Sequence, residues 1–304
     1  MLYLSLGTNL GNRSKNIQKA IALIGQQIGK VVLQATPIET QPVGFNSPHA
    51  FLNTAIGVST SLGINEILKA TQAIERQMGR LQKSINGIYH DRIIDIDILL
   101  YGNLVVDAPS LSVPHPRLPE RLFVLEPLAE IAPNLFHPFY GSTINDLLQA
   151  RKRCSIAALC EADCTPTLAK HINNMLAQLS SHSTPLTPQQ LVALSKEHNA
   201  DSTLYLLRDA ETNQLIATAT LAVCHLLTGS KAWIEDVVVD SPFRSKGYAH
   251  ILLNHLIYKA RLAKADSVNL TSRPLRVAAN KLYQRMGFNL RETNVYKMSL
   301  KCDE

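Results

Sequence analysis

The stretch "DRIIDIDILL", which begins at Asp91, constrains the fold more strongly than any other part of the chain. Isoleucine alternates with aspartate, and successive residues of a β-strand point to opposite faces of a sheet. A strand here therefore places the isoleucines on one face and Asp95 and Asp97 together on the other. Because the isoleucine face needs a hydrophobic core, we expect a half-buried strand in a sheet that is covered on at least one side.

Asp95 and Asp97 also carry the strongest chemical signal in the sequence. One interpretation is a polar strand face that meets water. Two parallel carboxylates repel each other, however, and a hard divalent cation relieves this repulsion, most often Mg²⁺ that also bridges phosphate groups. Arginine binds phosphate through two parallel hydrogen bonds, and the cationic side chains near the pair are Arg80, Arg92, His115, Arg117 and Arg121. This combination predicts a magnesium-dependent polyphosphate site.

The bulk composition indicates a soluble protein with two domains. The chain has 304 residues, which is long for one hydrophobic core, and 46% of them are hydrophobic and 18% charged. The net charge of +6 is spread evenly and only 6% of residues are aromatic, so we do not expect nucleic-acid binding. The five cysteines are scattered, no apolar run approaches about 20 residues, and the N-terminus has no export signal. We therefore expect a cytoplasmic protein with reduced thiols and no membrane contact.

Strand-like and helix-like runs alternate through residues 1–149 and predict a sheet domain of the α+β or α/β class. The expected strands lie at 1–7, 51–62 and 92–102, and the expected helices at 12–29, 65–81 and 122–133. The turn "GTNLGN" lacks the Lys-Ser/Thr of a phosphate-binding P-loop, so we interpret it as a strand-to-helix turn capped by Asn12 or Ser14.

The regular alternation of strand-like and helix-like runs ends near residue 150, and the stretch 151–170 shows no clear strand. We place a domain boundary within 150–166 and expect domains at 1–155 and 166–304. The second domain is expected to start with a helix at 168–180 and a second helix after a Ser/Thr/Pro-rich break. Its other expected elements are two strands within 202–226, a strand at 232–240, a helix within 241–265, a strand at 267–271, a helix at 277–286 and a final strand.

Four motifs of the first domain occur in a characteristic order: "LSLGTNLGNR", "FLNTAI", "RIIDIDILLYG" and "VPHPRL" followed by "RLFVL". Together they resemble 6-hydroxymethyl-7,8-dihydropterin pyrophosphokinase over residues 1 to about 145. The resemblance implies a ferredoxin-like α+β fold. It also implies transfer of the β,γ-pyrophosphoryl unit of ATP to the hydroxymethyl oxygen of a pterin, with release of AMP. Such a transfer depends on positioning and charge stabilisation more than on a general base.

Carried over by motif, the resemblance implies that Asp95 and Asp97 hold two Mg²⁺ ions. It implies that six residues contact ATP or neutralise its charge: Gln72, Glu75, Arg80, Arg92, His115 and Arg121. Of these, Arg80 and Arg92 would be catalytic. It also implies a pterin ring held between Phe51 and Phe123, with Asn53 at its edge and the Thr40–Gly44 backbone, including Val43 and Gly44, beside it. From the sequence without this resemblance, each phenylalanine is equally consistent with the hydrophobic core.

The segment "LQKSINGIYHD", residues 81–91, is expected to be a loop that closes over the substrates. It departs from the family pattern, which often has a second arginine at Gln82, a tryptophan at Tyr89 and Gly-Pro at His90-Asp91. The loop is also longer by about two residues. The sequence assigns no role to Asp91.

The second domain carries "RSKGYA", an R-x-x-G-x-A turn at residues 244–249, and later "ANKLYQRMGF". The turn alone is consistent with an ordinary helix that begins at a glycine. With the strands around it, the pattern resembles the GCN5-related N-acetyltransferase family over about 166–300, which has an α/β fold. The resemblance implies acetyl-CoA binding by Val237, Val239, Arg244, Lys246, Gly247, Ala249 and Asn280.

Two residues of this domain are candidate catalytic groups under the same resemblance. Tyr283 would be the general acid at the CoA sulfur, and Glu235 the general base. Helix packing for Tyr283 and a solvent-facing strand position for Glu235 remain open. The leading hypothesis is an ATP:pterin pyrophosphokinase fused to an N-acetyltransferase, both acting on small molecules. The alternative is a C-terminal domain that binds acetyl-CoA as a non-catalytic regulatory module.

Overall fold

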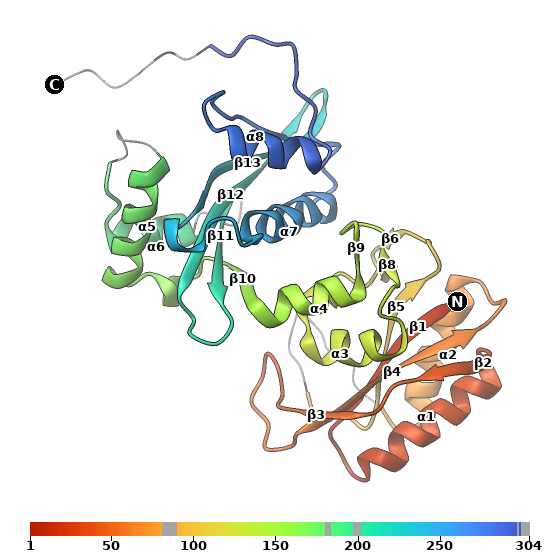
Figure 1. The fold of residues 1–304 in the computed structure, drawn as a ribbon. Coiled ribbons are helices and arrows are strands. Elements are labelled where there is room, and N and C mark those ends of the chain that lie inside the picture. Colours follow the sequence, from red (N-terminus) through yellow and green to blue (C-terminus); the bar gives the residue numbers. More distant parts are fainter. Residues whose placement is uncertain (81–89, 180–183, 197–201, 297, 299–304) are drawn as a thin grey trace.

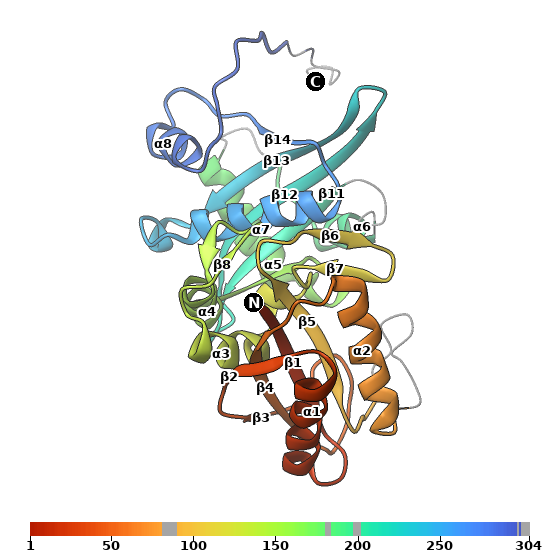
Figure 2. The same ribbon diagram turned by 90° about the vertical axis from the view of Figure 1, so that its right-hand side faces the viewer.

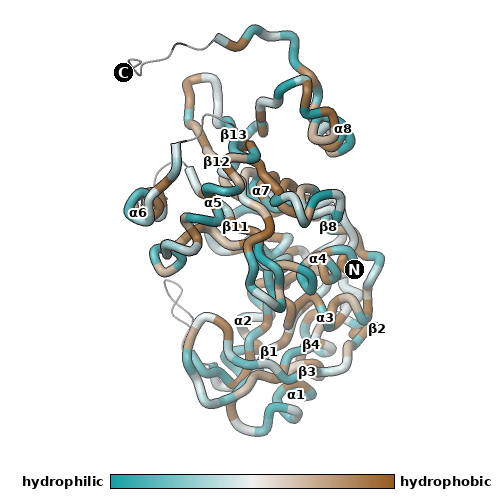
Figure 3. Tube along the Cα trace, turned by 60° about the vertical axis from the view of Figure 1, so that its left-hand side comes forward, coloured by the Kyte–Doolittle hydropathy of each residue, from teal (hydrophilic) through white to brown (hydrophobic). Residues whose placement is uncertain are grey.

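The computed structural model describes residues 1–80, 90–179, 184–196, 202–296 and 298. Its described part contains two five-stranded sheets, each with helices packed on both faces. Figure 1 shows the two sheet domains side by side, joined where α4 leads into β10. No described helix combines the length and apolar character that crossing a bilayer requires. In Figure 3 the central strands carry hydrophobic stretches, and the connecting loops are more hydrophilic.

The first sheet is antiparallel and has the strand order β2-β4-β1-β5, with a short β3 paired to β4. Its strands are β1 (Leu2–Thr8), β2 (Lys30–Gln34), β3 (Ile38–Thr40), β4 (Phe51–Ser59) and β5 (Asp95–Tyr101). The chain order β1-α1-β2-β4-α2-β5 with this strand order is the ferredoxin-like arrangement. The predicted α+β fold of this domain is confirmed.

Two pairs of helices cover opposite faces of this sheet (Figures 1 and 2). On one face lie α1 (Arg13–Gln27), which Asn12 caps as predicted, and α2 (Ile64–Gln77). They bury the side chains of Ile94, Ile96 and Ile98, the isoleucine face predicted from the alternation. The opposite face is packed by α3 (Leu122–Ile131) and α4 (Ile144–Arg153). Short elements connect them: β6 (Val106–Ala108), β7 (Leu111–Val113), η1 (Leu118–Glu120), β8 (Phe136–His137) and β9 (Ser142–Thr143).

The second sheet has the order β10-β11-β12-β13-β14, antiparallel except for the last pair. Its strands are β10 (Cys154–Ala158), β11 (Ser202–Asp209), β12 (Leu215–Leu226), β13 (Gly229–Val239) and β14 (Ser267–Leu270). On one face pack α5 (Pro166–Leu179) and α6 (Pro188–Lys196), and on the other α7 (Tyr248–Leu262). The remaining elements are η2 (Glu161–Asp163), η4 (Ser241–Phe243) and α8 (Val277–Arg285). Most elements predicted for this domain are confirmed.

Two predictions for the second domain differ from the structure. The stretch 151–170 was expected to lack a strand, but Cys154–Ala158 forms β10 and pairs with β11. This strand is short and lies at the sheet edge, so it lacks the alternation that would reveal it. A final strand was also expected, but none forms in 287–296 or at 298 among the described residues. Side chains there stay exposed, as at Leu290 and Val295, so no packing fixes an extended pairing.

Candidate active sites

The paired aspartates of β5 lie on the sheet face that α3 and α4 cover only in part. These helices pack around one end of the strands, near Leu99. Toward the other end, Asp95 pairs with Gly7 of β1, and Asp97 pairs with Ser5. Because Gly7 and Ser5 are small, they leave room above the sheet. The carboxylates of Asp95 and Asp97 line the cavity that results.

Two cavities meet at these carboxylates. The first has aromatic residues in its wall, and the second lies between α2, β5 and the β6–β7 hairpin. Both are lined by the same five charged residues: Arg92, Asp95, Asp97, Arg117 and Arg121. A group that passes between ligands in the two cavities would therefore pass beside two carboxylates and three guanidinium groups.

Asp95 is held by two of the predicted arginines. The Arg92 Nη2 atom lies 2.9 Å from Asp95 Oδ2, and Arg80 pairs with both Asp95 and Glu75. The Glu75 carboxylate also accepts a hydrogen bond of 2.9 Å from the backbone N–H of Ile96. These contacts fix α2 against β5 and place Glu75 at the wall of the second cavity.

Asp97 has weaker cationic contacts. The Arg121 Nη1 atom is 3.5 Å from Asp97 Oδ2, and His115 Nε2 is 4.0 Å away. Burial, and then the charge of Asp95, raise the pKa of Asp97 to about 6. Burial, and then the charge of Arg121, lower the pKa of His115 to about 4, so this imidazole is neutral at pH 7. Its Nδ1 atom accepts the N–H of Arg117, which leaves the proton on Nε2, the atom nearest to Asp97.

The carboxylate pair fits a hard divalent cation. Two oxygen ligands that repel each other, one with a raised pKa, gain from a cation placed between them and a phosphate. The described residues contain no cluster of three or more His, Cys, Asp or Glu ligands, so further ligands would come from water and substrate oxygens.

The first cavity contains most of the residues predicted for the pterin: Thr40, Val43, Phe51, Asn53 and Phe123. The guanidinium carbon of Arg92 lies 5.2 Å from the centre of the Phe51 ring, and that of Arg121 lies 5.5 Å from the Phe123 ring. Each phenylalanine in the cavity wall therefore packs against an arginine that also contacts one of the two aspartates. Gly44 is not part of the lining; with φ of +85° it turns the loop that carries Val43.

Asn53 is oriented by its neighbours. Its side-chain N–H₂ donates a hydrogen bond of 2.8 Å to the Thr40 hydroxyl. Gly7 lies opposite Asn53 on β1, and a Cβ at Gly7 would stand 2.8 Å from Asn53 Oδ1. Glycine is thus required by close approach, and this could not be predicted because the contact depends on strand register.

Asn9 and Asp91 support the backbone next to Arg92; sequence reasoning overlooked Asn9 and assigned no role to Asp91. Asn9 Oδ1 accepts the N–H of Arg92 at 2.8 Å, and its N–H₂ donates to Asp91 Oδ1 at 2.7 Å. The backbone N–H of Asn9 also donates to the carbonyl of Arg92. Asp91 therefore helps to anchor the backbone from which Arg92 projects. Of the predicted closing loop, Gln82 and Tyr89 lie outside the described residues, and His90 is exposed.

The second domain has a cavity of about 810 Å³ where β13 parts from α7 and α8. Six predicted residues line it: Val237, Val239, Arg244, Gly247, Ala249 and Tyr283. Gly247 precedes α7 with φ of +84°, a conformation that glycine adopts without strain. The first N–H groups of α7 point away from the helix, as anion binding at a helix N-terminus requires. Gln178 of α5, which was not predicted, accepts a hydrogen bond of 2.7 Å from Arg244.

Three predicted residues of this domain lie outside the cavity lining. The Lys246 ammonium lies 5.5 Å from the Phe243 ring centre. Asn280 donates hydrogen bonds to the carbonyls of Arg273 and Pro274. Glu235 is partly buried on β13, and burial, followed by the neighbouring Asp236, raises its pKa. A motif gives the spacing of such residues but not the direction of their side chains.

Comparison with known proteins supports both halves of the chain. The family model described as 7,8-dihydro-6-hydroxymethylpterin-pyrophosphokinase matches residues 3–133. The 2-amino-4-hydroxy-6-hydroxymethyldihydropteridine pyrophosphokinase of Porphyromonas gingivalis is 46% identical over 139 residues, which are 45% of this chain and 94% of that protein. The enzyme of the same name from Bacillus subtilis is 43% identical over 130 residues, or 42% of this chain and 76% of that protein.

The acetyltransferase (GNAT) family model matches residues 172–288. Among solved structures, a Trypanosoma brucei acetyltransferase is similar at 23% identity and a TM-score of 0.41, covering 48% of this chain and 99% of that one. Glucosamine-6-phosphate N-acetyltransferase from Arabidopsis thaliana has 20% identity and a TM-score of 0.41, with 48% and 97% covered. Both predicted resemblances are confirmed. The chain therefore belongs to the 7,8-dihydro-6-hydroxymethylpterin-pyrophosphokinase family, and its C-terminal half carries a domain of the acetyltransferase (GNAT) family.

Proposed function

We propose that the N-terminal domain transfers pyrophosphate from ATP to 6-hydroxymethyl-7,8-dihydropterin in folate synthesis, with Mg²⁺. The observation that carries this proposal is the pair Asp95 and Asp97 at the junction of two cavities. One cavity offers aromatic walls for a flat heterocycle, and the other offers cationic and polar groups for a nucleotide. The relatives that match this half are pyrophosphokinases by name, and relatives called folic acid synthesis proteins match it as well.

In this proposal Asp95 and Asp97 hold the Mg²⁺ ions, two of them as the family resemblance implies. When bound, the metal neutralises charge on the phosphate oxygens. Arg92 and Arg121 each contact one aspartate and lie against one phenylalanine ring. They are therefore oriented before substrate arrives, which is the arrangement that stabilises charge most effectively.

The remaining predicted residues divide between the cavities. Phe51 and Phe123 would hold the pterin ring, and Asn53 would bond to its edge. Gln72, Glu75, Arg80 and His115 line the second cavity and would face the nucleotide and its phosphates. Neutral His115 can donate from Nε2 to a phosphate oxygen, and this does not require a protonated ring.

The test is AMP formation from ATP, the hydroxymethyl pterin and Mg²⁺. Asp95→Ala and Asp97→Ala should each abolish it, whereas Asp107→Ala should not, because Asp107 lines neither cavity, is 57% exposed and pairs with Lys264. Wild-type AMP formation by the Asp95→Ala, Asp97→Ala double variant would refute the metal assignment.

For the C-terminal domain we propose acetyl-CoA binding and N-acetyl transfer to an amine. The cavity at the start of α7 supports binding, and Tyr283 in its wall supports a general-acid role at the CoA sulfur. Burial raises the pKa of Tyr283, which keeps its proton available for donation. The alternative, a module that binds acetyl-CoA without turnover, is favoured by the position of Glu235 outside the cavity lining.

Two measurements separate these alternatives. A thermal-shift titration with acetyl-CoA tests binding, and release of free CoA thiol across a panel of amines tests turnover. Binding with amine-dependent thiol release supports the enzyme, and binding without release from any amine supports the regulatory module.

We also propose that the two domains meet between α4 and β10, near Arg153 and Cys154. Arg153 ends the last helix that packs on the first sheet, and Cys154 begins the first strand of the second sheet. Limited proteolysis would test this division. Two stable fragments divided near Arg153 and Cys154 would support it, and stable fragments divided elsewhere would contradict it.

A further inference from the structure

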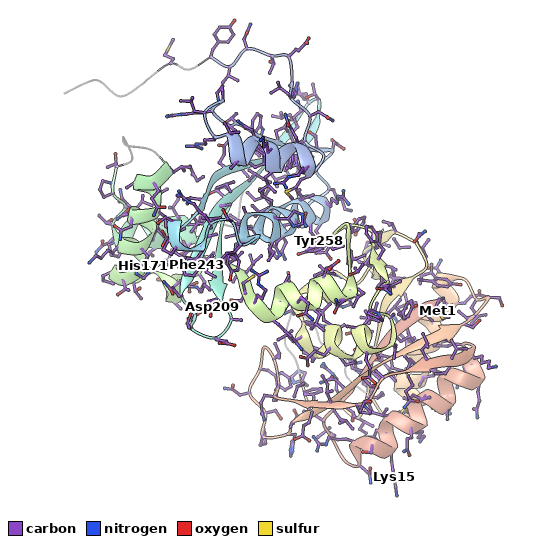
Figure 4. All side chains as sticks on the ribbon, in the orientation of Figure 1. Met1, Lys15, His171, Asp209, Phe243 and Tyr258 are labelled. Atoms are coloured by element: carbon purple, nitrogen blue, oxygen red, sulfur yellow. The ribbon has the colours of Figure 1, made fainter. Side chains whose placement is uncertain are left out.

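The C-terminal half of α7 is packed against the first domain. Tyr258 is completely buried, and its ring lies 4.8 Å from the ring of Tyr140 and 5.7 Å from that of His137. Both partners belong to the β8–β9 region of the pyrophosphokinase domain. In Figure 4 the label of Tyr258 stands where α7 meets this region. Tyr258 thus reaches from the acetyltransferase domain into a socket in the other domain.

Two adjacent residues of α7 contact one segment of the pyrophosphokinase site. The Tyr258 hydroxyl donates a hydrogen bond of 3.0 Å to the carbonyl of Pro116. The Lys259 ammonium lies 2.6 Å from Glu120 Oε1. Pro116 lies between His115 and Arg117 in the chain, and Glu120 directly precedes Arg121. The segment 115–121 therefore receives contacts from α7 at both of its ends.

This segment supplies three side chains to the site: His115, Arg117 and Arg121. The backbone of His115 is tied to β5 by a hydrogen bond of 2.9 Å to the carbonyl of Leu99. The Tyr258 bond is a second constraint, one residue further along. Because two constraints on adjacent residues define the direction of the chain, Tyr258 influences where the following arginines point.

Both contacts are suited to hold a fixed position. Burial, and then the charge of Glu120, raise the pKa of Tyr258, so its hydroxyl remains protonated and donates at any ordinary pH. Burial acts to raise the pKa of Glu120, but the bond and charge of Lys259 outweigh it and leave that pKa lowered. Glu120 therefore stays ionised, and its pair with Lys259 is only partly exposed, at 29% and 27%. Water and salt screen a partly buried ion pair less than a fully exposed one.

We infer that Tyr258 is a positioning residue of the pyrophosphokinase site, supplied by the acetyltransferase domain. It fixes the Pro116 carbonyl and through it the placement of His115 and Arg121 toward the phosphates. This inference rests on the proposed pyrophosphokinase function. It makes the second domain a structural part of the first active site and not only a second activity on the same chain.

The test uses the full chain with Tyr258→Phe, which keeps the ring in its socket and removes only the hydroxyl. We expect KM for ATP to rise about ten-fold, because misplacement of ligating groups by a fraction of an ångström has effects of this order. KM for the pterin should change less, since its predicted ring contacts, Phe51 and Phe123, lie on β4 and α3, and the segment 115–121 reaches that cavity only through Arg117 and Arg121. A purely structural defect would instead lower the amount of active enzyme and leave both KM values unchanged.

The matched control is Arg261→Met on the same helix. Arg261 Nη1 donates a hydrogen bond of 3.0 Å to the carbonyl of Phe139, which lies in the same interface but lines neither cavity. Its KM for ATP should equal that of the wild type. Lys259→Met is a second variant, expected to raise KM for ATP in the same direction through Glu120.

The outcomes separate the inference from the function on which it rests. A wild-type KM for ATP in Tyr258→Phe, or an equal rise in Arg261→Met, overturns the positioning role. Should Tyr258→Phe fail to fold, a wild-type KM for ATP in Lys259→Met overturns it. The wild-type chain is measured alongside: if it forms no AMP from ATP, the hydroxymethyl pterin and Mg²⁺, the proposed function fails, whereas AMP formation by the wild type with an unchanged KM for ATP in Tyr258→Phe refutes only this inference.

Discussion

Replacing Asp97 with asparagine is expected to stabilise the substrate-free chain at neutral pH while it abolishes pyrophosphoryl transfer. Asp97 is withdrawn from water beside Asp95, and its contact with Arg121 at 3.5 Å is long for an ion pair. The ionised carboxylate is therefore less stable in the folded chain than in the unfolded one. Asparagine keeps the shape of the side chain and removes the charge.

The size of the effect follows from the pKa. Burial, and then the charge of Asp95, raise the pKa of Asp97 from 3.8 to about 6 in the folded chain. At about 1.4 kcal/mol for each pH unit, this corresponds to at most about 3 kcal/mol. The side chain keeps 31% of its exposure, so we expect about 1–3 kcal/mol, or a rise in Tm of about 2–4 °C for each kcal/mol.

The pH dependence has a definite sign. Since the folded pKa lies above the unfolded one, the folded wild type binds the proton more tightly, and its stability falls as pH rises from about 4 to 6. Below about pH 4, Asp97 is protonated in both states, and the variant has no advantage. The gain in Tm should therefore be near zero at pH 4 and reach its full size above pH 6.

The assay is thermal unfolding at pH 4, 5, 6 and 7 in EDTA, with Asp107→Asn as an exposed control. A variant that is no more stable than the wild type at pH 7, or a gain independent of pH, would show that the cationic contacts of Asp97 outweigh burial and repulsion. Mg²⁺ with a non-hydrolysable ATP analogue should reverse the order, because a ligand stabilises the form that binds it.

Three further substitutions test other parts of the sites. Gly7→Ala would place a Cβ 2.8 Å from Asn53 Oδ1, so KM for the pterin should rise about ten-fold or more in steady-state kinetics while KM for ATP stays near its wild-type value. Asn9→Ala removes the side-chain bonds to the backbone of Arg92 and to Asp91, which should lower kcat and cost about 1–3 kcal/mol in urea unfolding. Gly247→Ala forces a side chain into φ of +84°, so calorimetry should show weaker acetyl-CoA binding and thermal unfolding a loss of about 1–2 kcal/mol. An unchanged value in any of these measurements would contradict the role inferred for the residue that was replaced.

The long strands could be predicted because their sequences show the two-residue alternation or the apolar runs typical of strands. β5 alternates isoleucine and aspartate, and the structure buries the isoleucines as that alternation requires. The short strands could not be predicted, because β3 and β10 have too few residues to show a period and form only where a distant strand offers an edge. The domain boundary could be predicted only to within 150–166 for the same reason, since β10 follows α4 directly.

The candidate site was predictable where function depends on charge. Carboxylates and arginines are conspicuous in an apolar strand, so Asp95, Asp97 and Arg92 could be identified before the structure. Gly7 and Asn9 were missed because their roles arise from register and from a loop brought near by folding. Such residues carry no chemical signal of their own until the partner strand is known.

Tyr258 shows why an interface of this kind escapes both motif reading and comparison with relatives. The Porphyromonas gingivalis protein is covered to 94% by its match to the first half of this chain, so it has no room for an equivalent of α7. In a protein of that length, the backbone corresponding to Pro116 must be held by solvent or by its own domain. In this chain the carbonyl bonds to a buried tyrosine of the second domain, and α7, whose first turn lines the cavity of about 810 Å³ in that domain, carries this tyrosine. One rigid helix therefore contacts both sites, so removing the second domain would expose the Tyr140 and His137 rings and leave the Pro116 carbonyl without its donor.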